Sequence, residues 1–434
     1  MSKLSINRIL DNVKSSQLAK DSLWAVLGNG LGYAILLVVG IIIARFLGKD
    51  VYGEYGMVKS TMLYIAGFAT MGIGVTSTKY ISEYLQKNSS EIRNIARDAM
   101  SITLCFSCMI AIVLTLIAKP LALYLNEPSL INPFKILGCL IICKAISTTQ
   151  NGILAGFCKF KAIAMNNIAC SVSMLLLAIP FTYTWGLYGA LSALLFTQAM
   201  NCILNYFSIR YIIKAYPINN YVSHKKELFL FSLPIAIQES SYTICSWGGT
   251  LLLVKLSSVG ELGIFSAVSQ WNAVILIVPG LLSNVVLSHL ASTKNDRYQH
   301  TKTIKVMLIV YFICSFIPFI IVYFLSSWIT TFYGPTFANM KYVLQVFIFC
   351  TIFHSCSNVF NSEFIVTHHN WLLMSIRTTK DCGILILAYI ILKNSDGIDG
   401  AMSYATAYLI GTIYYFIALI VFYNYKVKNK TIIR

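Results

Sequence analysis

Apolar residues occur along almost the whole chain in runs of about 20, separated by short polar segments. A helix needs about 20 mostly apolar residues to cross the hydrocarbon core of a bilayer. The runs lack the roughly ten-residue alternation that is typical of transmembrane strands. We therefore expect an all-α polytopic membrane protein. The pattern predicts twelve spans, at residues 23–47, 55–78, 99–118, 134–157, 162–184, 189–211, 228–253, 262–290, 304–325, 341–363, 371–392 and 400–423.

Composition supports the same interpretation and excludes several classes of protein. Of the 434 residues, 57% are apolar and 11% are charged, whereas soluble proteins are about 45–50% apolar and about 25% charged. A soluble enzyme and a disordered chain are both excluded, because a solvated surface needs more charge. The net charge is +17, but the basic residues form no continuous stripe, so we expect a lipid bilayer as partner and no nucleic acid.

The distribution of basic residues predicts the orientation of the spans. With the N-terminus in the cytosol, 24 of the 33 Lys and Arg residues lie on the cytoplasmic side, seven lie outside and two lie within spans. Cytoplasmic loops of membrane proteins carry the excess of positive charge, so both termini are predicted to be cytoplasmic. Residues 1–22 have apolar positions at helical spacing and predict an amphipathic helix on the membrane surface. Residues 424–434 form a basic tail.

Short motifs recur at an offset of about half the chain. The segment GLYGALS at 186–192 recurs as GIDGAMS at 397–403, and Gly53-Glu-Tyr55 recurs as Gly263-Ile-Phe265. Six is an even number of spans, so both copies enter the membrane in the same direction and form a parallel repeat. We predict two six-helix lobes, at 23–211 and 228–423, joined by a cytoplasmic linker at 212–227, with the substrate path between them.

The sequence indicates no enzymatic chemistry. The sequence contains no GxxxxGK[ST], HExxH or GxSxG, so direct ATP coupling and metalloprotease or serine hydrolase chemistry are not indicated. The twelve cysteines show no zinc-binding pattern and are interpreted as small packing residues. The pairs Gly28 with Gly32 and Gly152 with Gly156 predict faces where helices approach closely. We expect no metal and no cofactor.

Charged residues within the spans are the main candidates for function. An ionisable group at the centre of a bilayer costs about 2.5–3.5 kcal/mol, so it should face a cavity or a partner. Lys144 lies in the middle of the fourth span, Glu239 in the middle of the seventh, and Lys59 one turn into the second. Each lysine is either a cavity cation or part of a structural ion pair. Glu239 is either a site of proton or cation coupling or a static partner.

A second group of charged and polar residues has a stronger structural interpretation. Arg377 and Asp381 lie four residues apart in the eleventh span, next to Lys380, which favours a local salt bridge between the first two. Three charged residues lie at span ends, where long side chains reach the interface: Arg45, Lys255 and Glu363. Polar amides within spans either bond helices together or line a wet cavity: Gln150, Asn166, Asn167, Gln198, Asn201, Gln238, Gln270, Asn272 and Asn358.

The segment from Ile43 to Tyr55 reads IARFLGKDVYGEY. It resembles the signature after the first span of bacterial polysaccharide flippases (O-antigen type) in the multidrug/oligosaccharidyl-lipid/polysaccharide exporter superfamily. The resemblance implies a transporter rather than an enzyme. It also implies that an undecaprenyl-pyrophosphate-linked oligosaccharide moves from the cytoplasmic to the periplasmic leaflet of the bacterial cytoplasmic membrane by alternating access. Such transport serves the synthesis of O-antigen, capsule or another surface polysaccharide, alongside polymerase and chain-length proteins of the same pathway.

The resemblance also implies a kind of site, for which the charged residues of the spans supply candidates: Arg45 belongs to the signature, whereas Lys59 and Lys144 are chosen by their depth in the spans. It implies a cationic central cavity, for which the candidates are Lys59, Lys144 and Arg45, and coupling to protons or sodium, for which the candidates are Glu239 and Asp381. Two alternatives remain, a multidrug antiporter of the same superfamily and a membrane polymerase or ligase. The longest outer loop is short and contains no histidine, which argues against the enzyme.

Overall fold

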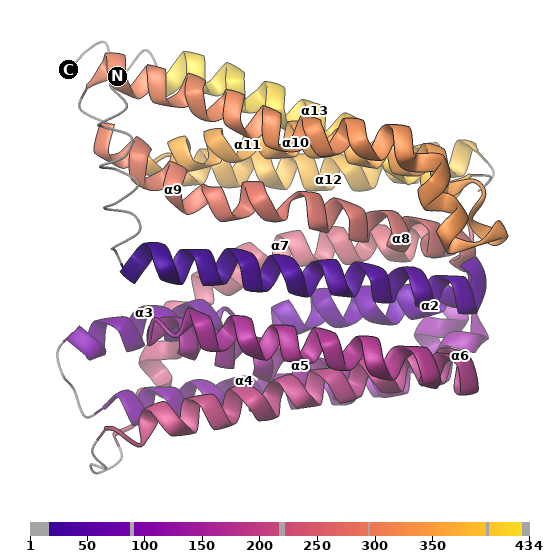
Figure 1. Cartoon of the computed structure of the whole chain (residues 1–434), viewed down its shortest axis with the longest axis horizontal. Coiled ribbons are helices and arrows are strands. Elements are labelled where there is room, and N and C mark those ends of the chain that lie inside the picture. The colour runs from indigo at the N-terminus through magenta and orange to yellow at the C-terminus, as the bar shows by residue number, and fades with distance from the viewer. Residues whose placement is uncertain (1–16, 87–90, 217–221, 294–295, 396–398, 428–434) are drawn as a thin grey trace. The chain divides into compact units, whose positions relative to one another are not determined.

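The computed structural model describes residues 17–86, 91–216, 222–293, 296–395 and 399–427 (Figure 1). These residues are largely helical and contain no strand, so the all-α prediction is confirmed. Of the predicted surface helix at 1–22, residues 1–16 lie outside the described part. The elements are α2 (Gln17–Ala69), α3 (Ile73–Gln86), α4 (Ile92–Tyr124), η1 (Pro128–Leu130), α5 (Ile131–Gly156), α6 (Phe160–Ile213), α7 (Lys225–Leu256), α8 (Val259–Ile275), α9 (Ile277–Thr293), α10 (Arg297–Tyr333), η2 (Pro335–Phe337), α11 (Met340–Val366), α12 (Asn370–Asn394), α13 (Gly400–Phe422) and η3 (Tyr423–Val427).

Seven helices of the described chain are long and apolar enough to cross a membrane, or eight if the bent helix α7 is included. Two of the seven, α2 and α6, contain more than one predicted span. The second and eighth predicted spans are divided between two helices each, α2 with α3 and α8 with α9. The eleventh span lies on α12, which carries charged residues near its middle. The twelve predicted spans thus map onto the helices, and the protein is an all-α, multi-pass membrane protein.

Two glycines separate consecutive spans within the long helices. Gly48 in α2 has φ 70° and ψ 169°, and Gly186 in α6 has φ 55° and ψ −129°. Glycine adopts such positive φ values without the steric cost that other residues bear. The chain reverses direction at Gly186, so the two halves of α6 lie side by side. Asn166 Nδ2 in the first half donates to Asn205 Oδ1 in the second half at 2.8 Å.

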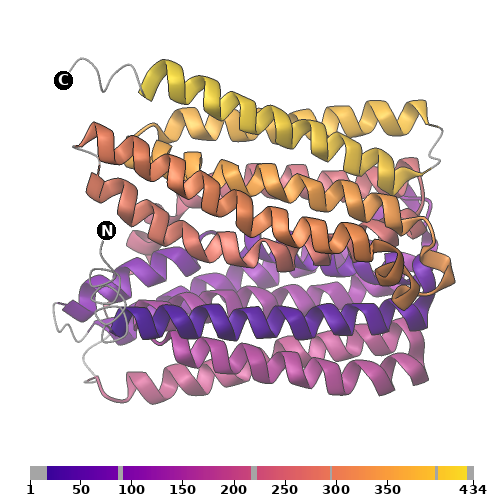
Figure 2. The same ribbon diagram turned by 45° about the horizontal axis from the view of Figure 1, so that its top comes forward.

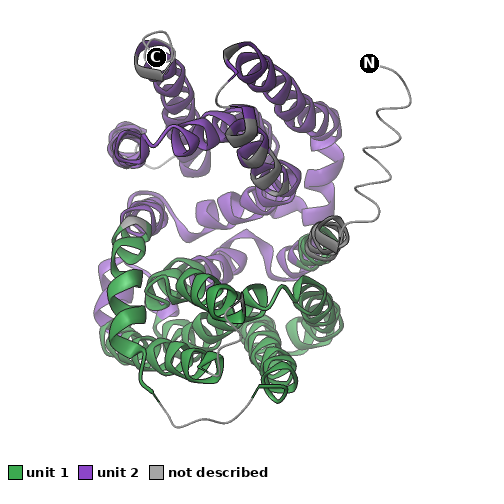
Figure 3. Cartoon of the chain, turned by 90° about the vertical axis from the view of Figure 1, so that its left-hand side faces the viewer, with its two compact units in different colours: residues 1–39, 61–118, 131–240 green, residues 40–60, 119–130, 241–434 purple. Residues whose placement is uncertain are grey.

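The helices form two compact units (Figure 3). One unit contains the described residues of 1–39, 61–118 and 131–240, and the other contains those of 40–60, 119–130 and 241–434. The second unit therefore includes two short segments from the first half of the sequence. The lobe boundaries predicted from the sequence remain a prediction.

In the first unit, α5 packs against α3 through the predicted small-residue face. A Cβ atom added at Gly152 would collide with the backbone of Gly74. Thr78 Oγ1 donates to the Gly152 carbonyl at 2.8 Å, and Ser82 Oγ donates to the Gly156 carbonyl at 3.1 Å. The packing role predicted for Gly152 and Gly156 is confirmed.

Amides bond the helices of the first unit together. Asn205 is fully buried, and its Nδ2 donates to Asn151 Oδ1 at 3.0 Å and to Asn201 Oδ1 at 2.8 Å. Asn201 Nδ2 donates to Asn167 Oδ1 at 3.2 Å, and Asn166 donates to Asn205. Interhelical hydrogen bonding is therefore the role of these amides, as expected in a setting where water is scarce.

In the second unit, α11 is the inner helix. It packs against α8, α9, α10 and α13, and it is the most buried of the candidate spans. Helix α12 lies along α13, as the orange and yellow ribbons of Figure 2 show. Polar side chains of α11 therefore face other helices, where they need partners.

Candidate functional site

Helices α11, α12 and α13 of the second unit contribute a group of polar and charged side chains from the middle of predicted spans. We call this group the C-terminal polar cluster. Its charged members lie on α12, and its histidine and amides lie on the inner helix α11. The cluster consists of His354, Asn358, Asn361, Arg377, Lys380, Asp381 and Tyr415.

Lys380 and Asp381 form the ion pair of the cluster. Lys380 Nζ lies 2.9 Å from Asp381 Oδ1, and each side chain is 11% exposed. The ammonium also lies 5.1 Å from the centre of the Tyr415 ring, within range of a cation–π interaction. The prediction of a local salt bridge between Arg377 and Asp381 is wrong, since Asp381 pairs with Lys380. The flexible four-carbon stem of this adjacent lysine allows its ammonium to reach the carboxylate.

Tyr415 connects this pair to the amides of α11. The Tyr415 hydroxyl donates to Asn361 Oδ1 at 2.6 Å, and Asn361 Nδ2 lies 3.3 Å from Asn358 Oδ1. Arg377 precedes Asp381 by about one turn on α12, and His354 precedes Asn358 by about one turn on α11. The cluster thus has two cations and one carboxylate, and it carries a net positive charge when His354 is neutral. Such a group can hold an anion or a polar ligand.

Sequence reasoning overlooked His354 and Tyr415. A histidine in the middle of a 23-residue apolar run was the available signal, since ionisable groups within spans are rare. Tyrosine gives no comparable signal, because 26 tyrosines are present. Among the described residues, no three His, Cys, Asp or Glu side chains come close enough together to hold a metal ion.

The predicted cavity cations lie in different settings. Lys59 on α2 is half-buried, with its Nζ 5.9 Å from the centre of the Tyr55 ring, and it belongs to the second unit. Lys144 on α5 is half-buried beside Cys202 in the first unit. Arg45 is exposed. The three side chains do not form a single cluster within one unit, and their roles stay predictions.

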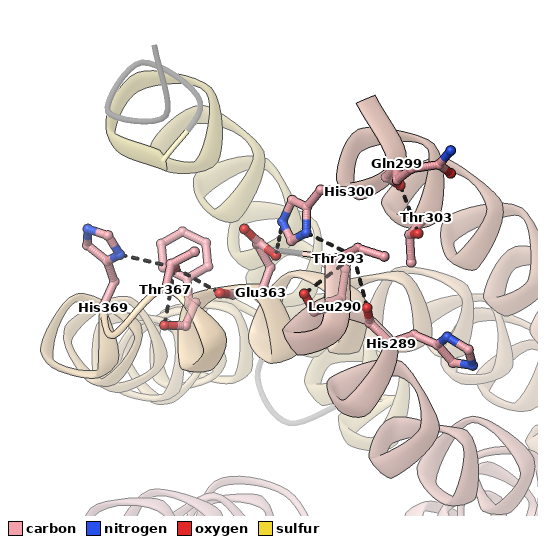
Figure 4. A network of polar contacts seen from close by, with 10 residues as sticks. His289, Leu290, Thr293, Gln299, His300, Thr303, Glu363, Thr367 and His369 are labelled. Atoms are coloured by element: carbon pink, nitrogen blue, oxygen red, sulfur yellow. Dashed lines mark hydrogen bonds and ion pairs between the residues drawn. The ribbon is translucent and has the colours of Figure 1, made fainter. Parts of the chain in front are cut away.

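The two glutamates predicted in spans differ in burial. Glu239 is exposed and adjoins a 45° bend of α7 that follows Ile237. Glu363 is fully buried in the last turn of α11 and pairs with His300 (Figure 4). The expectation that Glu363 reaches the membrane interface is therefore wrong, because a short carboxylate stem buried among helices cannot extend to water.

The segment from Ile43 to Tyr55, which carries the family resemblance, packs against helix α8. A Cβ atom added at Gly53 would collide with the backbone of Val259, and one added at Gly263 would collide with the backbone of Lys49. Positions 49 and 259 are separated by 210 residues, as are positions 53 and 263. Each motif therefore packs its glycine against the same position of the other motif, which is the contact that a two-fold relation between parallel repeats produces.

Glu261 connects the contact between the two glycine motifs to α13. Its Oε2 accepts from the backbone N–H of Ala401 at 2.9 Å, and its Oε1 lies 3.9 Å from Lys49 Nζ. Asp399, the N-cap residue of α13, provides no side-chain acceptor. A carboxylate at a helix N-terminus pairs with free N–H groups and is favoured by the helix dipole. Glu261 is thus the capping group of α13.

We expect Glu261→Ala to lower the stability of the protein by about 1–3 kcal/mol, because a buried N–H loses its acceptor. Glu261→Gln keeps an acceptor oxygen and should lose less. The melting temperature of the purified protein in detergent checks both variants. Equal melting temperatures for Glu261→Ala and the unmodified protein would contradict the capping role.

Solved structures show the same fold. An inward-facing multidrug resistance MATE family transporter of the MOP superfamily has a TM-score of 0.77 and 13% identity over 91% of this chain and 93% of its own. The lipid II flippase MurJ, in an inward closed conformation, has a TM-score of 0.72 and 15% identity over 91% of this chain and 87% of its own. A MOP superfamily transporter from Pyrococcus furiosus has a TM-score of 0.65 and 12% identity over 94% of each chain. These identities show the fold alone.

A comparison with protein families gives a more specific result. No curated protein matches the chain. The model of a family described as polysaccharide biosynthesis protein matches residues 18–287, which is more than half of the 434 residues. The protein is thus a multi-pass membrane protein with the fold of MOP superfamily transporters, and it belongs to the polysaccharide biosynthesis protein family.

Proposed function

We propose that the protein is a flippase that moves an undecaprenyl-pyrophosphate-linked oligosaccharide from the cytoplasmic to the outer leaflet by alternating access. The family match is the observation that carries this proposal. The shared fold with the lipid II flippase MurJ supports it. The transported glycan would serve O-antigen, capsule or another surface polysaccharide.

The physical chemistry of the cargo matches the charges of the chain. A pyrophosphate and its sugars cannot cross hydrocarbon unaided, because burying charges and hydroxyls without partners costs several kcal/mol or more. Cationic side chains within spans supply electrostatic partners for the pyrophosphate. Lys59, Lys144 and Arg45 are the proposed cations, and Arg377 and Lys380 of the C-terminal polar cluster are added to them. No bond chemistry is required, so the protein is proposed to be a transporter and not an enzyme.

Location and coupling complete the proposal. The resemblance supports a location in the bacterial cytoplasmic membrane, and the bias of basic residues supports both termini in the cytosol. Two six-helix lobes at 23–211 and 228–423, joined by the linker at 212–227, would alternate between inward-open and outward-open states. Polymerase and chain-length proteins of the same pathway are the proposed partners. Glu239 and Asp381 are proposed as groups that couple transport to protons or sodium. An exposed carboxylate such as Glu239 in mid-span needs water or an ion rather than lipid around it.

Complementation of a deletion strain tests the site residues. We expect Lys59→Ala, Lys144→Ala and Glu239→Gln each to reduce surface polysaccharide strongly at normal protein level, because the pyrophosphate or the coupling ion loses a partner. Arg45→Ala tests the remaining signature residue. Lys393→Ala is the matched control, since this exposed lysine lies in the last turn of α12. Full surface polysaccharide in all the site variants would contradict the assignment.

A further inference from the structure

The two ends of helix α6 lie side by side, because its halves run antiparallel from the turn at Gly186. Asn166 Nδ2 in the first half donates to Ser208 Oγ in the second half at 3.2 Å. This pairing places Lys161, five residues before Asn166, level with residues 210–213 of the second half. The basic residues at the two ends of α6 therefore lie near one another.

Each half of α6 has one exposed apolar stripe that ends in basic residues. In the first half the stripe consists of Met165, Val172, Leu176 and Ile179, and in the second half it consists of Phe196, Ile203 and Phe207. Neighbouring members are three, four or seven residues apart, which places them on one face of a helix. Lys161 lies four residues before the first stripe, and Arg210 and Lys214 lie three and seven residues after the second. All three cations are exposed and continue the stripes.

The opposite face of α6 at this end packs into the first unit. Ile209 is buried in an apolar core cluster, and Ile163, Ile212 and Ile213 pack against that cluster. The exposed stripes therefore point away from the core. On a membrane-spanning helix, we interpret such exposed apolar side chains as contacts with lipid tails, which are as apolar as leucine.

The length of α6 places these cations at the level of lipid headgroups. Arg210 lies 24 residues after Gly186, which is about 36 Å along an α-helix. The hydrocarbon core of a bilayer is only about 30 Å thick. Exposed Trp185 and Tyr188 flank Gly186 and mark the other interface, where aromatic residues of this kind are enriched. The cations therefore lie beyond the hydrocarbon, on the side predicted to be cytoplasmic, at the depth of lipid phosphates.

Helix α6 contains no carboxylate that could neutralise these cations. Residues 128–226 include the whole of α5 and α6 and contain neither aspartate nor glutamate. Basic residues between membrane helices on the cytoplasmic side bind the phosphates of anionic lipids. The charge and the apolar stripes together match the two parts of an anionic phospholipid, its headgroup and its acyl chains.

The second repeat has no cations at the equivalent positions. At the repeat offset of 210 or 211 residues, the counterparts of the three cations are Trp371, Val421 and Tyr425. These counterparts are exposed as well. The topology therefore does not require basic residues at these positions, and the three cations are a feature of the first repeat.

We propose that Lys161, Arg210 and Lys214 bind the phosphate of an anionic phospholipid, whose acyl chains lie along the two exposed stripes. We call this group the α6 lipid site. Arginine binds phosphate through paired N–H donors, and lysine binds it as a point charge. The site takes a lipid of the bilayer and not the transported cargo, so it stands apart from the proposed function.

Native mass spectrometry of the purified full-length protein in detergent tests the α6 lipid site. The probe is phosphatidylglycerol, and the reference is phosphatidylcholine with the same acyl chains, which we expect to bind less tightly. Arg210→Gln with Lys214→Gln should weaken phosphatidylglycerol binding by about 25-fold, since each cation near an anionic lipid contributes about fivefold. Lys225→Gln with Lys226→Gln is the matched control, because it removes the same charge from exposed positions at the start of α7. This control should bind phosphatidylglycerol like the unmodified protein.

A charge-preserving variant and the melting temperature separate binding from folding. Arg210→Lys with Lys214→Arg should keep most of the phosphatidylglycerol binding. All the variants should melt like the unmodified protein, because the substituted side chains are exposed. An unchanged affinity for phosphatidylglycerol in Arg210→Gln with Lys214→Gln, or an equal loss in the matched control, would overturn the proposal.

Two further probes distinguish other occupants of the site. Glycerol phosphate has the headgroup without acyl chains, so it should bind far more weakly than phosphatidylglycerol; equally tight binding would contradict a lipid site. Undecaprenyl pyrophosphate carries the headgroup of the proposed cargo and should bind Arg210→Gln with Lys214→Gln as it binds the unmodified protein. If this variant lost undecaprenyl pyrophosphate and kept phosphatidylglycerol, the site would belong to the cargo and the proposal would be wrong.

Discussion

Lys380→Gln is expected to destabilise the protein by about 3–5 kcal/mol, because Asp381 would be left as a buried charge without its partner. The two side chains lie 2.9 Å apart and are each 11% exposed, so water cannot replace the ammonium effectively. The measurement is the melting temperature of the purified protein in detergent. Surface polysaccharide in the deletion strain should fall at the same time.

A double variant separates folding from function at this position. Lys380→Gln with Asp381→Asn removes both charges and should recover most of the lost stability, since a neutral pair leaves no uncompensated charge. Surface polysaccharide should remain low if Lys380 also binds the pyrophosphate or Asp381 also couples transport to an ion. Lys380→Arg keeps the charge and should keep activity. Full recovery of surface polysaccharide in the double variant would show that Lys380 and Asp381 both have only a structural role.

Gly53→Ala and Gly263→Ala are expected to have the second largest effect. At both positions the new methyl group would meet the backbone of the other repeat motif, which cannot rotate away as a side chain can. Overpacking of this kind costs about 1–3 kcal/mol, and more where backbone must move. The two variants should lower the melting temperature by similar amounts, because the two glycines occupy equivalent positions in the repeat.

Gly67→Ala is the matched control on the same helix. An added Cβ atom at Gly67 has no neighbouring atom within 4 Å, and alanine is favoured over glycine in a helix by about 1 kcal/mol. This variant should be as stable as the unmodified protein or slightly more stable. If Gly67→Ala lowered the melting temperature as much as Gly53→Ala does, close packing between the two repeat motifs would not be the cause of the loss.

Periodicity and composition predicted the helical fold because each span must be apolar over about 20 residues, and that requirement is visible in any single run. The roles of Gly152 and Gly156 were also predictable, since close helix packing requires small residues four apart. Division of a span into two helices was harder to predict. The break between α2 and α3 falls inside one predicted span, where Met71 has φ 50° and Gly72 has φ 69°.

The polar sites depend on helix phase and pairing, which one sequence does not contain. Asp381 has an arginine four residues away and a lysine beside it, and side-chain spacing alone favoured the wrong partner. Glu363 lies 63 residues from His300, so its burial and pairing arise only after α10 and α11 pack. The amides of the first unit show the same limit, because a hydrogen-bonded amide and a cavity amide look identical in sequence.

The central claim is that this chain carries a lipid-linked oligosaccharide across a bilayer. Its most direct measurement uses liposomes that contain the purified protein and a fluorescent undecaprenyl-pyrophosphate-linked oligosaccharide, with a membrane-impermeant quencher outside. We predict that the protein makes the fluorescent lipid of the inner leaflet accessible to the quencher, and that liposomes without protein do not. Absence of this transfer, in vesicles where the same protein moves a cationic drug, would contradict the flippase and support the multidrug antiporter.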